Sequence, residues 1–178
     1  MDAEPASLVS RSLVVVDHLI ASFIGLLVGG LPAVLFTEYL PLDGLLLIAA
    51  AVGLANVGYF IYFEGRDGTT PVKQRFGLQV VTRDGSPIGY QQAAVRNIVR
   101  LGELATAYLV GIGLATATAY SQRPGDIAAS TVVIEPEDQA DSYRLKAREV
   151  SEQDRIVGYL VAGIGVLPLI GMLLQLAT

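Results

Sequence analysis

Long apolar segments alternate with polar ones along the chain. The apolar segments cover residues 12–36, 45–63, 104–120 and 156–177. A helix of roughly 20 largely apolar residues crosses the hydrocarbon core of a bilayer, which is about 30 Å thick. The pattern therefore predicts an all-α membrane protein, a small bundle of three to four transmembrane helices that passes several times through the cell membrane.

The third apolar segment leaves the number of crossings open. Its 17 residues extend about 26 Å as a helix, and Gly111 and Gly113 weaken its middle. In one interpretation it crosses the membrane, and the acidic connector that follows lies outside. In the other it is a re-entrant element that returns to its own side. The positive-inside rule favours the second interpretation, because four bases precede the last apolar segment: Arg144, Lys146, Arg148 and Arg155.

The polar loop of residues 64–102 contains six Lys and Arg residues, so the positive-inside rule predicts that it is cytoplasmic. Residues 76–81 have the composition of a short strand, and residues 83–87 that of a turn. The loop is therefore predicted to be short and β-hairpin-like.

A helix is predicted to begin near Gln91. Arg96 and Arg100 are four residues apart, while Val95, Ile98 and Leu101 lie on another side. Separate polar and apolar sides predict a helix that lies at the membrane surface.

Three regions follow from these patterns. Residues 1–134 form a membrane domain, residues 135–155 a charged amphipathic connector, and residues 156–177 a C-terminal transmembrane helix. The pattern from Tyr143 to Arg148 predicts a short helix within the connector.

Composition removes several classes of function. The net charge is −5, from 17 acids and 12 bases, whereas nucleic-acid binding requires a basic surface. The chain has no Cys, which excludes disulfides, and a single histidine, His18, which disfavours a zinc site. The common phosphate-binding, metalloprotease and nucleophile motifs are missing from the sequence. We therefore expect no enzyme activity, no catalytic residues, no metal and no cofactor.

Ionisable residues stand at the beginning of the first apolar segment: Arg11, Asp17 and His18. A charged side chain within a membrane costs about 2.5–3.5 kcal/mol or more at a helix centre, so it requires a partner. In a structural interpretation, Arg11 extends to the lipid headgroups and Asp17 accepts hydrogen bonds from another helix. In a functional interpretation, Asp17 handles an ion or a proton.

Asp126 follows Gly125 and begins a predicted helix, where a carboxylate favours the exposed backbone N–H groups. The alternative is a buried bond to Arg96 or Arg100. Gly25 and Gly29 have the spacing that lets two helices approach closely, within one chain or between copies.

Several segments resemble the RDD domain family of small integral membrane proteins, named for an Arg and two Asp residues. The resemblance begins at Arg11 and continues through residues 16–20, 64–81, 84–87, 95–100 and 125–133. It ends at Val133, before the last apolar segment. By this resemblance the name-giving residues are Arg11, Asp17 and Asp126.

The resemblance implies an unassigned activity, with transport of a proton or a monovalent cation suggested for some members. Under this hypothesis the protein is a homo-oligomer in the lipid bilayer. Asp17 and Asp126 exchange the ion, Arg11 and Arg96 set its affinity, and His18 and Arg100 support them. The alternative is a non-enzymatic membrane module that binds a partner protein through residues 64–102 and 121–155.

Overall fold

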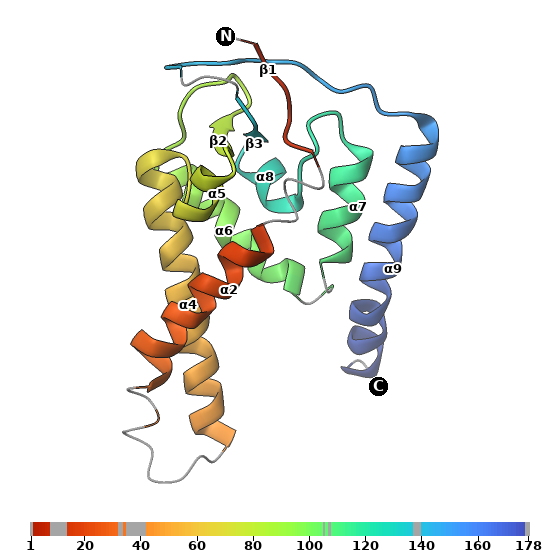
Figure 1. Cartoon of the computed structure of the whole chain (residues 1–178). Coiled ribbons are helices and arrows are strands. Elements are labelled where there is room, and N and C mark those ends of the chain that lie inside the picture. The colour runs from red at the N-terminus through yellow and green to blue at the C-terminus, as the bar shows by residue number, and fades with distance from the viewer. Residues whose placement is uncertain are drawn as a thin grey trace.

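The computed structural model describes residues 2–7, 14–31, 34, 42–104, 106, 108–136 and 140–176. Long helices project in one direction from a layer that contains the short strands (Figure 1). Arg11 lies outside the described residues.

The first two apolar segments form neighbouring helices. Helix α2 (Val14–Gly25) continues into the π-helical turn η1 (Leu26–Gly30), and both pack against α4 (Leu42–Asp67). A methyl group added at Gly25 would lie 2.9 Å from the carbonyl oxygen of Val52. The close approach predicted at Gly25 therefore takes place within the chain.

The loop after α4 folds into a compact layer with distant parts of the chain. Its elements are α5 (Pro71–Arg75) and β2 (Gln79–Thr82), and β2 pairs antiparallel with β3 (Thr131–Ile134). The predicted β-hairpin is thus not the main pairing, since only one isolated bridge joins Val81 to Pro87. Val80 and Val81, the central residues of β2, are buried against β3. All four residues of β3 are β-branched, which favours a strand.

Between the two strands, the chain makes a helical hairpin of α6 (Tyr90–Leu104) and α7 (Leu109–Ala117). The nine residues of α7 extend about 14 Å, less than half of a bilayer core. Because β2 and β3 pair, Arg83 and Asp126 lie at the same end of the molecule. The described part of the third apolar segment is therefore a short helix rather than one long enough to cross the membrane by itself.

Helix α6 is not the surface helix that its pattern predicted. Arg96, Asn97 and Arg100 are buried against α4 and α8 (Pro124–Ala128), whereas Ile98 and Leu101 are exposed. The polar side of α6 faces inward because Arg96 pairs there with two buried carboxylates, Glu64 on α4 and Asp126 on α8. This is the reverse of an amphipathic helix in a water-soluble protein.

The connector is extended in its described part, and the helix predicted from Tyr143 to Arg148 is wrong. Strand β4 (Arg144–Leu145) pairs in parallel with β1 (Asp2–Ala3). The N–H group of Tyr143 donates to the carbonyl oxygen of Gly85 at 2.9 Å, and its side chain is buried beside β2 and β3. These backbone bonds to other segments replace the local bonds of a helix.

The last helix, α9 (Glu152–Leu176), packs against α7 through glycines. A methyl group on Gly113 would overlap the carbonyl oxygen of Gly158, and a methyl group on Gly158 would overlap that of Gly113. The two backbones therefore touch directly.

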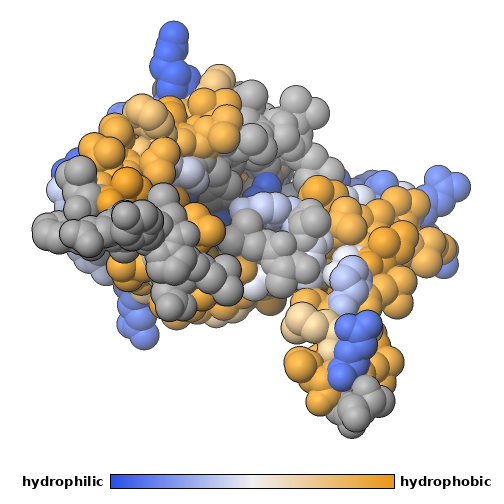
Figure 2. All heavy atoms as spheres, turned by 90° about the horizontal axis from the view of Figure 1, so that it is seen from below, coloured by the Kyte–Doolittle hydropathy of each residue, from blue (hydrophilic) through white to orange (hydrophobic). Residues whose placement is uncertain are grey.

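Two of the described helices are long and apolar enough to cross a membrane, by length and composition: Gly44–Asp67 in α4, and α9. Seen from the end where the helices project, hydrophobic atoms cover much of their described surface (Figure 2). The structure is thus mostly helical, with apolar side chains outside.

Candidate functional site

Glu64, in the last turn of α4, is the centre of a buried charged cluster. Its side chain is 0% exposed. One carboxylate oxygen, Oε1, pairs with Lys73 Nζ. The other, Oε2, lies 3.3 Å from Arg96 Nε and accepts a hydrogen bond of 2.8 Å from Asn97 Nδ2. One carboxylate thus holds together α4, α5 and α6.

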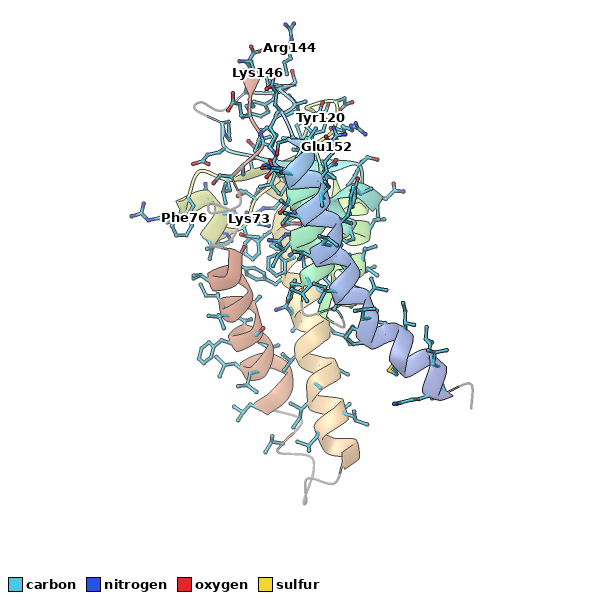
Figure 3. All side chains as sticks on the ribbon, turned by 90° about the vertical axis from the view of Figure 1, so that its right-hand side faces the viewer. Lys73, Phe76, Tyr120, Arg144, Lys146 and Glu152 are labelled. Carbon is cyan, nitrogen blue, oxygen red and sulfur yellow. The ribbon has the colours of Figure 1, made fainter. Side chains whose placement is uncertain are left out.

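Lys73 reaches Glu64 because α5 begins in a fixed way. Thr70 is the N-cap, its hydroxyl accepts from the N–H group of Lys73 at 3.2 Å, and Pro71 occupies the first turn. The ammonium lies 5.3 Å from the centre of the Phe60 ring. Burial lowers the pKa of Lys73, and the nearby Glu64 opposes that shift. Figure 3 shows Lys73 within the body of the molecule, whereas Arg144 and Lys146 project at its upper end.

Asp17 is fully buried where α2 meets α4 and α5. The Tyr59 hydroxyl donates to its Oδ1 at 3.1 Å, and the Thr70 hydroxyl donates to its Oδ2. The predicted hydrogen bonds from another helix are therefore present. Thr70 joins Asp17 to the rest of the cluster, because the same residue caps the helix that carries Lys73.

Asp126 combines both of its predicted roles. It lies in the first turn of α8, where its Oδ2 accepts from the N–H group of Arg123 at 3.1 Å. Its Oδ1 lies 3.3 Å from Arg96 Nη1. Gly125 allows this contact, because a methyl group there would overlap the carbonyl oxygen of Arg96.

These contacts arrange five buried residues in a line of alternating charge: Asp17, Lys73, Glu64, Arg96 and Asp126. The carboxylate of Asp17 acts on Lys73 electrostatically, and ion pairs join each of the later neighbours. We call this set the charged line. Burying charges in this way is tolerated only where each has partners of opposite charge or hydrogen bonds.

Arg100 lies beside the charged line with its guanidinium 4.9 Å from the centre of the Phe60 ring. Its Nη1 has no hydrogen-bond partner among the described residues. A cavity of about 30 Å³ adjoins Arg100 and Asn97. Its other lining residues are Asn56, Val57, Phe60, Leu101 and Tyr108. The cavity has room for about two water molecules next to a buried cation.

Two predicted site residues, Asp17 and Asp126, lie at the opposite ends of the charged line and do not contact each other. Arg96 lies within it and Arg100 beside it. Arg11 lies outside the described residues, and for His18 only the backbone, in α2, is described. No group of three or more possible metal ligands is found in the part of the chain that was described.

Sequence reasoning missed the two central residues, Glu64 and Lys73, which it assigned to a polar loop. The available signal was position, since Glu64 directly ends an apolar span and Lys73 follows the helix start at Thr70 and Pro71. Charges at span ends usually face water, so this signal was weak.

Apolar helix surfaces around a fully buried charged line are typical of helical membrane proteins. A family model described as RDD family matches residues 5–130. The match covers more than half of the chain, and the protein belongs to the RDD family, a family of membrane proteins. No curated protein and no solved structure matches the chain.

Proposed function

We propose that this protein resides in the cell membrane as a multi-pass homo-oligomer and moves a proton or a monovalent cation along the charged line. The charged line is the single observation that carries the proposal. Its residues come from α2, α5, α4, α6 and α8, and each is at most 3% exposed. A polar interior enclosed by apolar helix surfaces is what ion movement through a membrane requires.

Stability alone does not favour such a line. A buried ion pair is often no more stabilising than apolar residues of similar volume, because desolvation offsets the attraction between the charges. Five buried charges of alternating sign, with a small cavity beside Arg100, therefore support a role in exchanging an ion in addition to joining the helices.

Binding of a partner protein through residues 64–102 and 121–155 is the second candidate. The backbone pairing of β2 with β3 and the burial of Arg96 and Asp126 direct these segments toward each other. This inward arrangement favours transport over partner binding.

Flux in proteoliposomes tests the proposal. Purified protein is reconstituted, and cation-dependent proton movement is followed with an internal pH dye over a panel of monovalent cations. We expect flux in the unaltered protein and at least a tenfold loss in Asp17→Asn and Glu64→Gln variants that elute as folded protein.

Asp67→Asn is the matched control, because Asp67 lies on α4 three residues after Glu64 but is exposed and pairs with Arg66. It should transport normally. Absence of flux with every cation in the unaltered protein, together with a protein partner retained in mild detergent, would favour the binding module instead.

A further inference from the structure

Glu103 is a buried carboxyl group that the charged line does not include. It lies near the end of α6 and is 3% exposed. Arg96 and Arg100 precede it by seven and three residues, so all three share the inner side of α6. Its Oε2 has no hydrogen-bond partner among the described residues. The backbone N–H group of Gly125 donates a hydrogen bond to this carboxyl group, but burial removes water from Oε2 and no donor replaces it there, which makes the charged form costly.

The fold makes room for this carboxyl group on α7. A methyl group on Gly111 would overlap Glu103 Oε2 and lie 3.1 Å from its Cδ. The carboxyl group therefore rests directly on the backbone of α7, at a position where any larger residue would displace it. Gly111, one of the two glycines that weaken the third apolar segment, thus makes room for the carboxyl group of Glu103.

Charged groups face Glu103 from two elements. Arg96 and Arg100 come from its own helix, and Arg123 and Asp126 come from the beginning of α8. From α7, the packed residue is Gly111, which has no charge. Burial raises the pKa of Glu103, and Asp126 adds to this, whereas Arg123 and Arg100 oppose it. The two charge states of Glu103 are therefore closer in free energy than those of an exposed glutamate at neutral pH.

The charge of the whole cluster depends on Glu103. Lys73, Arg96, Arg100 and Arg123 supply four positive charges, and the remaining carboxylates, Asp17, Glu64 and Asp126, supply three negative ones. The sum is +1 when Glu103 carries a proton and 0 when it does not. One proton on Glu103 and one monovalent cation in the cluster give the same total charge, so exchanging one for the other leaves the charge of the cluster unchanged.

We propose that Glu103 is the proton-binding residue of this cluster, and that its carboxylate takes up one proton when a monovalent cation leaves and releases it when a cation enters. The proposal that Glu103 binds a proton rests on its burial, on the unpartnered Oε2 and on the contact with Gly111. The exchange with a cation rests on the proposed function. The step is a simple acid–base reaction in which the carboxylate gains or loses one proton, and no other bond changes.

Infrared difference spectroscopy of the reconstituted protein, from about pH 5 to about pH 9, tests proton binding directly. A protonated carboxyl group has a carbonyl stretching band that its carboxylate lacks. We expect such a band to titrate in the unaltered protein and to be lost in Glu103→Gln. Retention of the whole band in a folded Glu103→Gln protein would contradict the proposal.

Gly111→Ala provides a second variant that leaves Glu103 in place. The added methyl group displaces the carboxyl group, so the midpoint of the band should shift by at least half a pH unit. Gly102→Ala is the control, because a methyl group there meets no atom within 4 Å and should leave the midpoint unchanged. Equal midpoints in both variants would also contradict the proposal, even if Glu103→Gln failed to fold.

The flux assay separates this proposal from the proposed function. If the band depends on Glu103 but the unaltered protein moves no cation, transport is wrong and proton binding at Glu103 stands. If cations are exchanged with the same pH profile in Glu103→Gln, transport stands and Glu103 is not the proton-binding residue.

Discussion

Glu64 and Lys73 pair their charges where neither side chain is more than 1% exposed. Removing one partner leaves the other charge buried, so we expect Lys73→Met to destabilise the protein by about 3 kcal/mol. Glu64→Gln combined with Lys73→Met should cost less than the sum of the two single variants, by about 1–2 kcal/mol. Unfolding in detergent micelles measures all three. The exposed Arg66–Asp67 pair should show no measurable coupling in the same cycle. Additive effects at Glu64 and Lys73 would mean that their pairing contributes nothing.

Asp17 accepts from two hydroxyl groups, those of Tyr59 and Thr70. Asp17→Asn keeps one acceptor oxygen, whereas Asp17→Leu removes the acceptor of both hydroxyl groups, at a cost of about 1–3 kcal/mol for the buried Thr70 hydroxyl. We therefore expect a lower yield of folded protein from Asp17→Leu than from Asp17→Asn. Size-exclusion chromatography after mild extraction gives the yields. Equal yields would show that these hydrogen bonds do not hold α2 in place.

Glu103 should make stability depend on pH. Its pKa is raised in the folded chain, so the folded state keeps the proton to higher pH than the unfolded chain, whose glutamate titrates near about 4.3. The contribution of Glu103 to the free energy of unfolding is therefore complete below its pKa in the unfolded chain. It is lost as the pH rises through its pKa in the folded protein. Thermal unfolding of Glu103→Gln should show an advantage over the unaltered protein that grows as the pH rises above the unfolded pKa. Glu152→Gln, at an exposed site, should show no such trend.

The pairing of β2 with β3 fixes the topology of the α6–α7 hairpin. The N–H group of Arg83 donates to the carbonyl oxygen of Ser130 at 2.8 Å, so we expect both residues to lie on the same side of the membrane. Single cysteines at Ser86 and Ser130 should react equally with an impermeant thiol reagent in intact cells, and the chain has no native Cys to interfere. Labelling of Ser130→Cys alone would show that the third apolar segment crosses.

Helix α9 should separate from α7 when its contact glycine is enlarged. We expect Gly158→Ala to lower the unfolding temperature by several degrees, because the methyl group meets the backbone of Gly113. Gly163→Ala, five residues further along α9, meets nothing within 4 Å and should be neutral. Similar unfolding temperatures for the two variants would mean that α9 is not held at this contact.

The sequence could predict those elements whose signal is local. The long apolar runs predicted α4 and α9, and Asp17 and Asp126 stood out as ionisable residues at unusual positions. For α6, the periodicity predicted a helix, but the same pattern fits a polar side that faces water or one that faces buried charges. Only the contacts with Glu64 and Asp126 decide between them.

Other features depend on residues far apart in the chain. Strand β2 pairs with β3 after a whole helical hairpin, so its composition could predict a strand but not its partner. The partnership of Glu64 with Arg96 likewise arises only when α4 and α6 pack together. Sequence spacing contains no direct measure of such contacts.

The glycine contact between α7 and α9 makes the last helix a separable part of the protein. The family match ends at residue 130, before α9 begins, and the extended connector attaches this helix from outside the hairpin. All five residues of the charged line come from elements before the connector. We therefore expect that a different helix with a small residue at this contact can replace α9 and leave the charged line intact.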